Sequence, residues 1–233
     1  MMLDLEQVTA SYGASQILFG IDLKVEKGET VCILGRNGVG KTTTLKTING
    51  TLKPRQGNIR FEGHNIGGLP TYRVSRLGIA YVPQGRHIFA SLTTKENLLI
   101  AARKGESSIP QWNIERIYQL FPVLKNRESF RGRSLSGGEQ QMLTVARGLM
   151  QNPKLLLLDE ICEGLAPFIV KELEMIIQEL KKSGVSILLA EQNIRFAMAV
   201  SSRCYILEKG QVVYSGNTSD IPQDTIRKYL ATQ

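Results

Sequence analysis

Short, nearly continuous apolar runs are the clearest pattern in the chain, and they predict the strands of a central sheet. The runs lie at 30–34, 155–158 and 185–190. Such runs are typical of parallel strands that are covered on both faces. Helical periodicity at 42–49 and 168–181 supplies candidates for the covering helices. The second of these segments has one apolar face, formed by Val170, Leu173, Ile176, Ile177 and Leu180. The alternation of strands and helices predicts an α/β domain.

Two other regions have a different pattern of apolar and polar residues. The N-terminal stretch and residues 57–62 alternate apolar and polar positions, which predicts a small antiparallel β layer. Residues 85–149 lack buried-strand runs and predict a helical insertion. The helical patterns within it lie at 94–102, 114–120 and 139–150.

The C-terminal part predicts a hairpin, 204–207 with 212–215, followed by a short helix near 223–230. No internal repeat or linker divides the chain. We therefore expect one domain of 233 residues, in which 1–84 and 150–233 form a core with the β layer and 85–149 form a helical subdomain.

Charge and cysteine content narrow the class of protein. The chain has 29 Lys and Arg against 21 Asp and Glu, a net charge of +8 that favours an anionic partner such as nucleic acid or a membrane surface. Much of this positive charge lies in 36–86, which contains nine basic residues and a single acid, Glu62. The acidic start predicts no export signal, and no apolar run is long enough to span a bilayer. Cys32, Cys162 and Cys204 have no paired spacing, which suits a reducing cytoplasm.

A glycine-rich loop follows the first apolar run and matches G-x-x-x-x-G-K-[ST], the P-loop. Its residues are Gly35, Arg36, Asn37, Gly38, Val39, Gly40, Lys41 and Thr42. Glycines allow the backbone N–H groups to surround phosphate oxygens, and the helix that follows adds its positive N-terminal end. Lys41 is expected to reach the β and γ phosphates of a nucleotide, and the Thr42 hydroxyl to bind Mg²⁺.

A second apolar run, 155–158, ends in two acids and suits the partner motif of a P-loop. Asp159 is expected to hold Mg²⁺ through water. Glu160 then lies near the γ phosphate, where a carboxylate can orient and deprotonate an attacking water. The two motifs together predict a nucleotide-hydrolysing enzyme.

A further segment precedes the strand predicted at 155–158, whose final acids form the Walker B motif. This segment, Leu135-Ser136-Gly137-Gly138-Glu139, resembles the signature sequence of ATP-binding cassette proteins. This resemblance covers essentially the whole chain. It implies a P-loop NTPase (RecA-like) core with an antiparallel β subdomain and a helical subdomain. It also implies that two cassettes pack head to tail, so that Ser136–Glu139 of one chain closes on the nucleotide of the other. Read from the residues alone, this segment opens a helix and forms a second anion-binding N-terminus.

The resemblance assigns further positions. Tyr12 matches the aromatic residue that stacks on adenine, and Thr43 extends the phosphate-binding loop. Gln84 matches the glutamine that touches Mg²⁺ and water and connects to the helical subdomain. Gln192 occupies the usual place of the switch histidine, and it can hydrogen-bond a phosphate but cannot become cationic. With Glu160, the residues implied in catalysis are therefore Gln84 and Gln192.

Several segments are similar to the LivF type of cassette, one of two that drive branched-chain amino-acid importers. They are Gly35–Gly38, Pro83–Phe89, Glu163–Pro167 and Glu191–Asn193. Cassettes of urea, amide and other amino-acid importers are closely similar. One departure is Ile161-Cys162, where the family usually has proline and then Ser or Thr. For Cys162 a packing role is favoured over a redox-sensitive one, because no basic residue nearby in sequence would lower its pKa.

The resemblance implies an ATPase that uses ATP and Mg²⁺ to drive import at the cytoplasmic face of a bacterial or archaeal membrane. Its implied partners are a second cassette, two separate permease subunits and, indirectly, an extracytoplasmic solute-binding protein. We expect a heterodimer of cassettes, with a homodimer open for the isolated subunit, and no nucleic-acid partner. Two alternatives remain: a soluble cassette acting on nucleic acid, suggested by the charge, and a regulatory nucleotide-binding partner with little turnover, suggested by Gln192 and Ile161.

Overall fold

The computed structural model describes residues 1–104 and 111–230. Its strands are β1 (Leu3–Tyr12), β2 (Ser15–Val25), β3 (Thr30–Leu34), β4 (Gln56–Phe61), β5 (His64–Asn65), β6 (Ile79–Val82), β7 (Leu155–Asp159), β8 (Ser186–Glu191), β9 (Arg203–Glu208) and β10 (Gln211–Asn217). Its α-helices are α1 (Lys41–Ile48), α2 (Thr71–Arg76), α3 (Thr94–Leu99), α4 (Ile114–Leu120), α5 (Pro122–Asn126), α6 (Gly137–Leu149), α7 (Pro167–Lys182), α8 (Ile194–Val200) and α9 (Gln223–Thr225). Single 3₁₀ turns at Gly132–Ser134 and Thr218–Asp220 and a π turn at Ile226–Leu230 complete the described chain.

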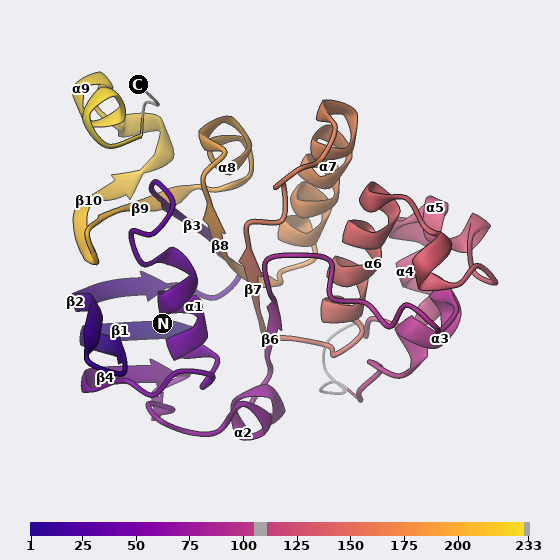
Figure 1. Cartoon of the computed structure of the whole chain (residues 1–233), viewed down its shortest axis with the longest axis horizontal. Helices are drawn as coiled ribbons and strands as arrows, with labels where there is room; N and C mark the ends of the chain where they lie inside the picture. The colour runs from indigo at the N-terminus through magenta and orange to yellow at the C-terminus, as the bar shows by residue number, and fades with distance from the viewer. Residues whose placement is uncertain (105–110, 231–233) are drawn as a thin grey trace.

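The strands form two sheets (Figure 1). The larger has the order β10-β9-β3-β8-β7-β6, and the smaller has the order β2-β1-β4-β5. Strands β6, β7, β8, β3 and β9 run parallel, while β10 returns antiparallel to β9. The predicted central strands and the predicted antiparallel layer are therefore confirmed, and the α/β class with them.

The central strands are buried on both faces, which explains their continuous apolar runs. Because successive side chains of a strand point to opposite faces, each strand feeds two cores. Leu156 and Leu158 of β7 pack in a core with α6, α7 and α8. Leu155 and Leu157 pack in a second core with α1 and the small sheet. The P-loop and the ends of β7 and β8 are thus held between two packed layers.

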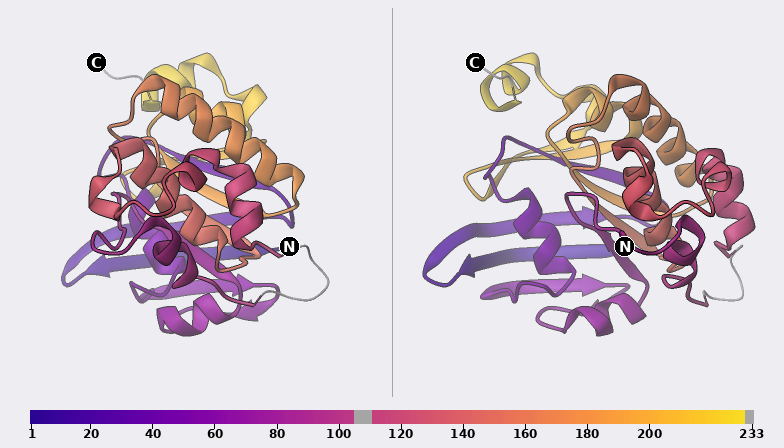
Figure 2. Two further views of the ribbon diagram at one scale, coloured as in Figure 1. Left: turned by 90° about the vertical axis from the view of Figure 1, so that its right-hand side faces the viewer. Right: turned by 45° about the vertical axis from the view of Figure 1, so that its right-hand side comes forward.

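Helices α3 to α6 gather on the side away from the small sheet, as Figure 1 and the two turned views of Figure 2 show. Two helix boundaries differ from the prediction by two or more residues. The helix expected at 94–102 ends at Leu99, and the helix expected at 139–150 begins at Gly137. The second shift arises because Ser136 caps the helix, so Gly137 and Gly138 lie inside its first turn.

Helices α2, α5 and α8 and strands β5 and β6 were not predicted, and the two strands, of two and four residues, are too short to show a periodicity. Cys32, Cys162 and Cys204 are free and buried. No helix within residues 1–104 and 111–230 combines the length and the apolar content of a membrane span.

Candidate nucleotide site

The P-loop connects β3 to α1, and neighbouring backbone fixes its shape. Gly40 caps α1 with a φ of 111°, a left-handed conformation that favours glycine. A Cβ on Gly40 would lie 2.8 Å from Leu18 Cδ2, and one on Gly35 would lie 2.7 Å from the Leu207 oxygen. The N–H of Gly210 donates to the Val39 oxygen at 2.9 Å, so the turn between β9 and β10 supports the loop.

Lys41 is buried at the centre of the site with its ammonium group fully engaged. Its Nζ donates to the carbonyl oxygens of Gly35 (2.9 Å) and Arg36 (3.0 Å). Its third contact is an ion pair with Glu160 Oε1 at 2.9 Å, in which both side chains are less than a tenth exposed. The structure therefore brings the P-loop lysine and the expected catalytic carboxylate into direct contact.

Asp159 ends β7 beside the first turn of α1. Thr42 Oγ1 donates to Asp159 Oδ1 at 3.0 Å, and the Tyr81 hydroxyl donates to Oδ2 at 2.8 Å. Burial raises the pKa of Asp159, although the two hydroxyl hydrogen bonds oppose this by stabilising the carboxylate. The same burial, with Asp159 nearby, raises the pKa of Tyr81. Sequence reasoning missed Tyr81; the only available signal is its place on β6, three residues before Gln84.

Gln84 follows β6, and its side chain contacts two carboxylates in the segment after β7. Its Nε2 donates to Glu160 Oε2 at 3.2 Å and to Glu163 Oε2 at 2.9 Å. Gln84 thus contacts the expected catalytic carboxylate directly. The predicted contact of Gln84 with Mg²⁺ stays a prediction.

Glu160 has an unusual backbone. Its φ is 46°, in the left-handed region that non-glycine residues seldom adopt and that costs on the order of 1 kcal/mol. Its N–H donates to the Ala190 oxygen of β8 at 2.8 Å, which continues the sheet pairing one residue beyond β7. The side chain is thereby turned from the end of the strand toward Lys41. Nothing in the sequence predicts this conformation.

Ile161-Cys162, the departure from the family pattern, is held by a buried carboxylate. The N–H of Cys162 donates to Glu191 Oε1 at 3.1 Å, and Glu191 is only 2% exposed. Burial raises the pKa of Glu191 to about 7, against the hydrogen bonds from Cys162 and Asn193. Burial and Glu191 also raise the pKa of the Cys162 thiol, which agrees with a packing role for this cysteine. Sequence reasoning gave Glu191 no role.

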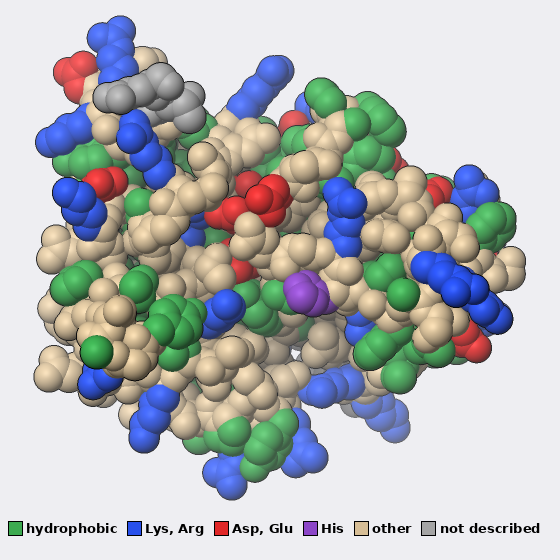
Figure 3. All heavy atoms as spheres, in the orientation of Figure 1, with side chains coloured by type: hydrophobic (Ala, Val, Ile, Leu, Met, Phe, Trp, Pro, Cys, Tyr) green, Lys and Arg blue, Asp and Glu red, His purple; other side chains and the backbone are tan. Residues whose placement is uncertain are grey.

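Gln192 lies beside these carboxylates and is exposed. It lines an open cavity of about 250 Å³ together with Glu160, Cys162, Glu163, Glu191 and Asn193. In Figure 3 acidic side chains gather near the centre of the face, with basic ones both close to them and around the edges. The structure therefore places Gln192 near Glu160.

The signature segment forms the N-terminus of α6, on the other side of β6 and β7 from α1 (Figure 1). Ser136 and Glu139 form a capping box: Glu139 N–H donates to Ser136 Oγ at 3.3 Å, and Ser136 N–H donates to Glu139 Oε2 at 2.7 Å. Burial acts to raise the pKa of Glu139, but these bonds and Arg127 lower it overall. Within the described chain, no hydrogen bond or ion pair joins Ser136–Glu139 to the P-loop. Their contact with a nucleotide stays a prediction.

Tyr12 completes the predicted set, and Arg86 adds a contact near Gln84. Tyr12 ends β1 and is 46% exposed, and its stacking on adenine stays a prediction. Arg86, two residues after Gln84, packs its guanidinium against Gly137, where a Cβ would collide with Nη1. Its Nη2 donates to the Gly164 oxygen at 3.3 Å. Arg86 thus connects the loop after β6, the signature and the segment after Glu160.

The donor atoms suit a nucleotide phosphate with a hard divalent cation. Thr42 and Asp159 present a hydroxyl and a carboxylate oxygen 3.0 Å apart, the kind of oxygen donors that Mg²⁺ takes when phosphate and water complete its shell. The loop itself can be shaped only by glycine at Gly35 and Gly40. Above Gly38 a Cβ would meet no atom within 4 Å, so the loop leaves room for a ligand there.

A model of the ABC transporter family matches residues 18–163. The chain belongs to the ABC transporter family. It is accordingly an ATPase, and the P-loop NTPase fold that the resemblance implied is confirmed by the solved cassettes that the chain resembles. ATPases of this family bind ATP and act as dimers together with membrane permease subunits.

Known ABC ATPases resemble the chain over nearly its full length. The high-affinity branched-chain amino acid transport ATP-binding protein BraG of Pseudomonas aeruginosa is 42% identical over 212 residues, 91% of each chain. The lipopolysaccharide export system ATP-binding protein LptB of Haemophilus influenzae is 34% identical over 237 residues, covering 100% of this chain and 98% of LptB. A nucleotide-free ATP-binding cassette from an ABC transporter superposes with a TM-score of 0.83 at 27% identity, covering 98% and 94%.

Proposed function

We propose that the protein is the ATP-hydrolysing subunit of an importer for branched-chain amino acids. The supporting observation is its 42% identity to BraG, against 34% to LptB, with near-complete coverage in both. We further propose that it works at the cytoplasmic face of a bacterial or archaeal membrane. Its partners there are two permease subunits, a different second cassette and, indirectly, a solute-binding protein. In this proposal 1–84 and 150–233 act as the core and 85–149 as the helical subdomain.

In this proposal the phosphates of ATP bind the P-loop, residues Gly35–Thr43, and Tyr12 stacks on the adenine. Lys41 bonds the β and γ phosphates, while Thr42, Asp159 and Gln84 hold Mg²⁺. Bound there, Mg²⁺ offsets the negative charge of the phosphates. The hydroxyls of Thr42 and Tyr81 already orient the two oxygens of Asp159, which lowers the cost of arranging the cation site.

Glu160 is the proposed general base, and its present contacts indicate how it is controlled. Its Oε1 pairs with Lys41 and its Oε2 accepts from Gln84. Phosphate oxygens compete with Glu160 for the Lys41 ammonium group. When phosphate oxygens bind Lys41, the Glu160 carboxylate is released and can accept a proton from water. Gln84 orients this carboxylate, and Gln192 bonds the γ phosphate.

The signature supplies the second half of the site in the proposed head-to-tail dimer. The hydroxyl of Ser136 and the N–H groups of Gly137, Gly138 and Glu139 lie at the N-terminus of α6, which favours a phosphate. Because α6 lies apart from the P-loop of its own chain, these groups are proposed to act on the partner's nucleotide. A heterodimer is favoured because LivF-type cassettes are one of two in their importers.

Uptake by intact cells tests the proposed substrate. A strain lacking this protein, carrying either the wild type or a Lys41→Ala variant, is assayed with radiolabelled leucine, urea and acetamide. We expect loss of leucine uptake with Lys41→Ala and full uptake with the wild type. Urea or amide uptake that depends on Lys41 would replace the proposed substrate. Unchanged uptake together with lost lipopolysaccharide at the cell surface would instead favour the LptB-like role.

A further inference from the structure

A cavity of about 790 Å³ lies at the edge of the large sheet opposite to the nucleotide site. It is lined by Gly78, Lys154 and Val185, which stand just before β6, β7 and β8. The P-loop and Asp159 stand at the other ends of the parallel strands β3 and β7. The cavity is therefore separate from the ATP site, and none of the roles derived above uses it.

The lining of this cavity is strongly basic. Its described residues include six Lys and Arg against one acid, Glu62, which pairs with Lys154 at 2.9 Å. The six are Lys27, Arg76, Arg103, Lys104, Arg116 and Lys154. Like charges gathered around one cavity repel one another, and a bound anion relieves that repulsion.

Four of these cations are exposed, and within the described chain they have no acidic partner: Lys27, Arg76, Arg103 and Lys104. Arg103 Nη1 donates to Ser75 Oγ at 2.7 Å, and the Arg76 guanidinium lies 5.8 Å from the centre of the Tyr72 ring. A hydroxyl and an aromatic ring carry no formal charge. Both guanidinium groups therefore keep their full positive charge for a ligand.

The basic side of the cavity is held in place by Asn152. This residue adopts a left-handed φ of 52°. Its Nδ2 donates to the carbonyl oxygens of Arg103 (2.7 Å) and Trp112 (3.1 Å), and its Oδ1 accepts from the Trp112 N–H at 2.6 Å. Asn152 thus fixes the backbone at Arg103 and Trp112, which lowers the cost of ordering this part of the chain when a ligand binds.

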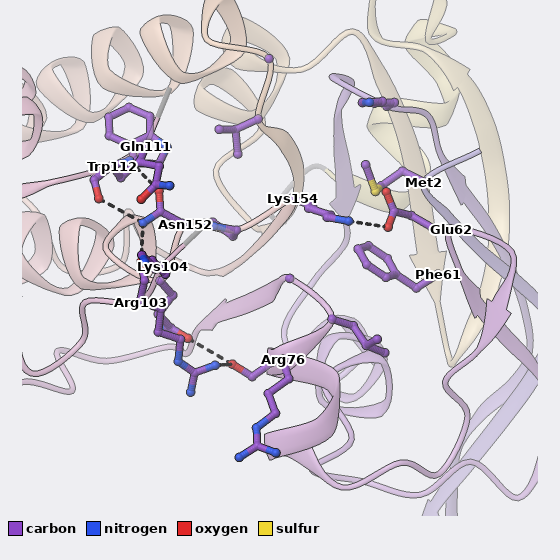
Figure 4. Close-up of a pocket in the computed structure, with 18 of the residues that line it drawn as sticks. Met2, Phe61, Glu62, Arg76, Arg103, Lys104, Gln111, Trp112, Asn152 and Lys154 are labelled. Atoms are coloured by element: carbon purple, nitrogen blue, oxygen red, sulfur yellow. Dashed lines mark hydrogen bonds and ion pairs between the residues drawn. The ribbon is translucent and has the colours of Figure 1, made fainter. Parts of the chain in front are cut away.

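The other side of the cavity carries apolar side chains beside the Glu62–Lys154 ion pair. Figure 4 shows Met2 and Phe61 across the cavity from Arg103, Lys104 and Trp112, with Arg76 at the bottom of the view. Leu77, which is 40% exposed, adds further apolar surface to the lining. The cavity thus combines a cationic side with a side where apolar groups lie beside one ion pair, in a volume typical of sites for small organic ligands.

We propose that this cavity binds an amphipathic phosphate ester of nucleotide size. Its phosphate groups bond Arg76, Arg103 and Lys104, and its apolar part packs against Met2, Phe61 and Leu77. Arginine favours this chemistry because its planar group can donate two hydrogen bonds to one phosphate. The ligand comes either from the soluble pool or from the headgroup of a phospholipid.

The fluorescence of Trp112 reports directly on this cavity, because Trp112 lines it and is the single tryptophan of the chain. The full-length protein is titrated with octyl phosphate as the probe and with uncharged octyl glucoside as its matched control, both as monomers in solution. We expect a saturable change with octyl phosphate, weakened by salt, and none with octyl glucoside. Saturating Mg-ATP leaves the titration unchanged.

The double variant Arg76→Ala/Arg103→Ala should weaken octyl phosphate binding about tenfold or more, because each charge-assisted hydrogen bond is lost. Lys95→Ala, which removes an exposed charge on α3, should bind like the wild type. Equal binding by the double variant, or competition by Mg-ATP, would overturn the proposal. If the protein sediments with phosphatidic acid vesicles and this requires the two arginines, the ligand is a lipid headgroup. If it binds octyl phosphate but not the vesicles, the ligand is a soluble phosphate ester.

Discussion

The buried carboxylate of Glu191 makes the stability of this ABC ATPase depend on pH in a direction that the structure determines. Burial raises its pKa from an ordinary value of 4.5 to about 7. Between these two values the folded protein binds more protons than the unfolded chain, so stability falls as pH rises. At pH 5 the folded protein keeps the group neutral, whereas at pH 8 it must hold a buried charge.

The magnitude follows from the two pKa values. With 4.5 unfolded and about 7 folded, the penalty grows by roughly 2 to 3 kcal/mol between pH 5 and pH 8. Glu191→Gln removes the titration but keeps an oxygen for the Cys162 N–H. For a chain of this length, the melting temperature of the variant relative to the wild type should therefore rise by about 5 to 10 °C from pH 5 to pH 8.

The assay is thermal unfolding followed by circular dichroism at pH 5, 6, 7 and 8 without nucleotide. Glu115→Gln is the matched control, since it makes the same chemical change at an exposed position on α4. The control should track the wild type at every pH. A difference between Glu191→Gln and the wild type that stays constant from pH 5 to pH 8 would refute the reasoning.

Two further substitutions test the geometry around the site. Tyr81→Phe removes the hydroxyl from Asp159, so we expect a higher Mg²⁺ concentration for half-maximal ATPase activity, with unchanged secondary structure; an unchanged Mg²⁺ requirement would contradict the contact. Gly210→Ala would drive a Cβ into the Ile17 oxygen at a φ of 76°, while Gly184→Ala has a φ of 80° but meets no atom within 4 Å. Thermal unfolding should therefore show a much larger loss for Gly210→Ala, and equal losses would count against the collision.

The large features of this fold could be predicted because they follow from burial on both faces. Strands β3, β7 and β8 lie at the centre of the sheet, and their continuous apolar runs indicate this position. Strand β6 is an edge strand of four residues and gives no such signal. The P-loop and the acids after β7 were also predictable, since both follow parallel strands that end at the same edge of one sheet.

The contacts that tune the site could not be predicted, because they join residues far apart in the chain through side-chain geometry alone. Tyr81 reaches Asp159 across the pairing of β6 with β7, and Glu191 reaches the N–H of Cys162 from the end of β8. The left-handed conformation of Glu160 depends on its bond to β8 rather than on its own preference. Single-sequence patterns carry no information of this kind.

The role of Glu160 is the central claim, and steady-state ATP hydrolysis tests it most directly. Glu160→Gln is compared with the wild type and with Glu172→Gln, a control on α7, and binding of a fluorescent ATP analogue is measured for each. Loss of a general base should lower turnover by roughly 10² to 10⁴ while the analogue still binds. The control should hydrolyse ATP like the wild type. Wild-type turnover in Glu160→Gln would contradict the account.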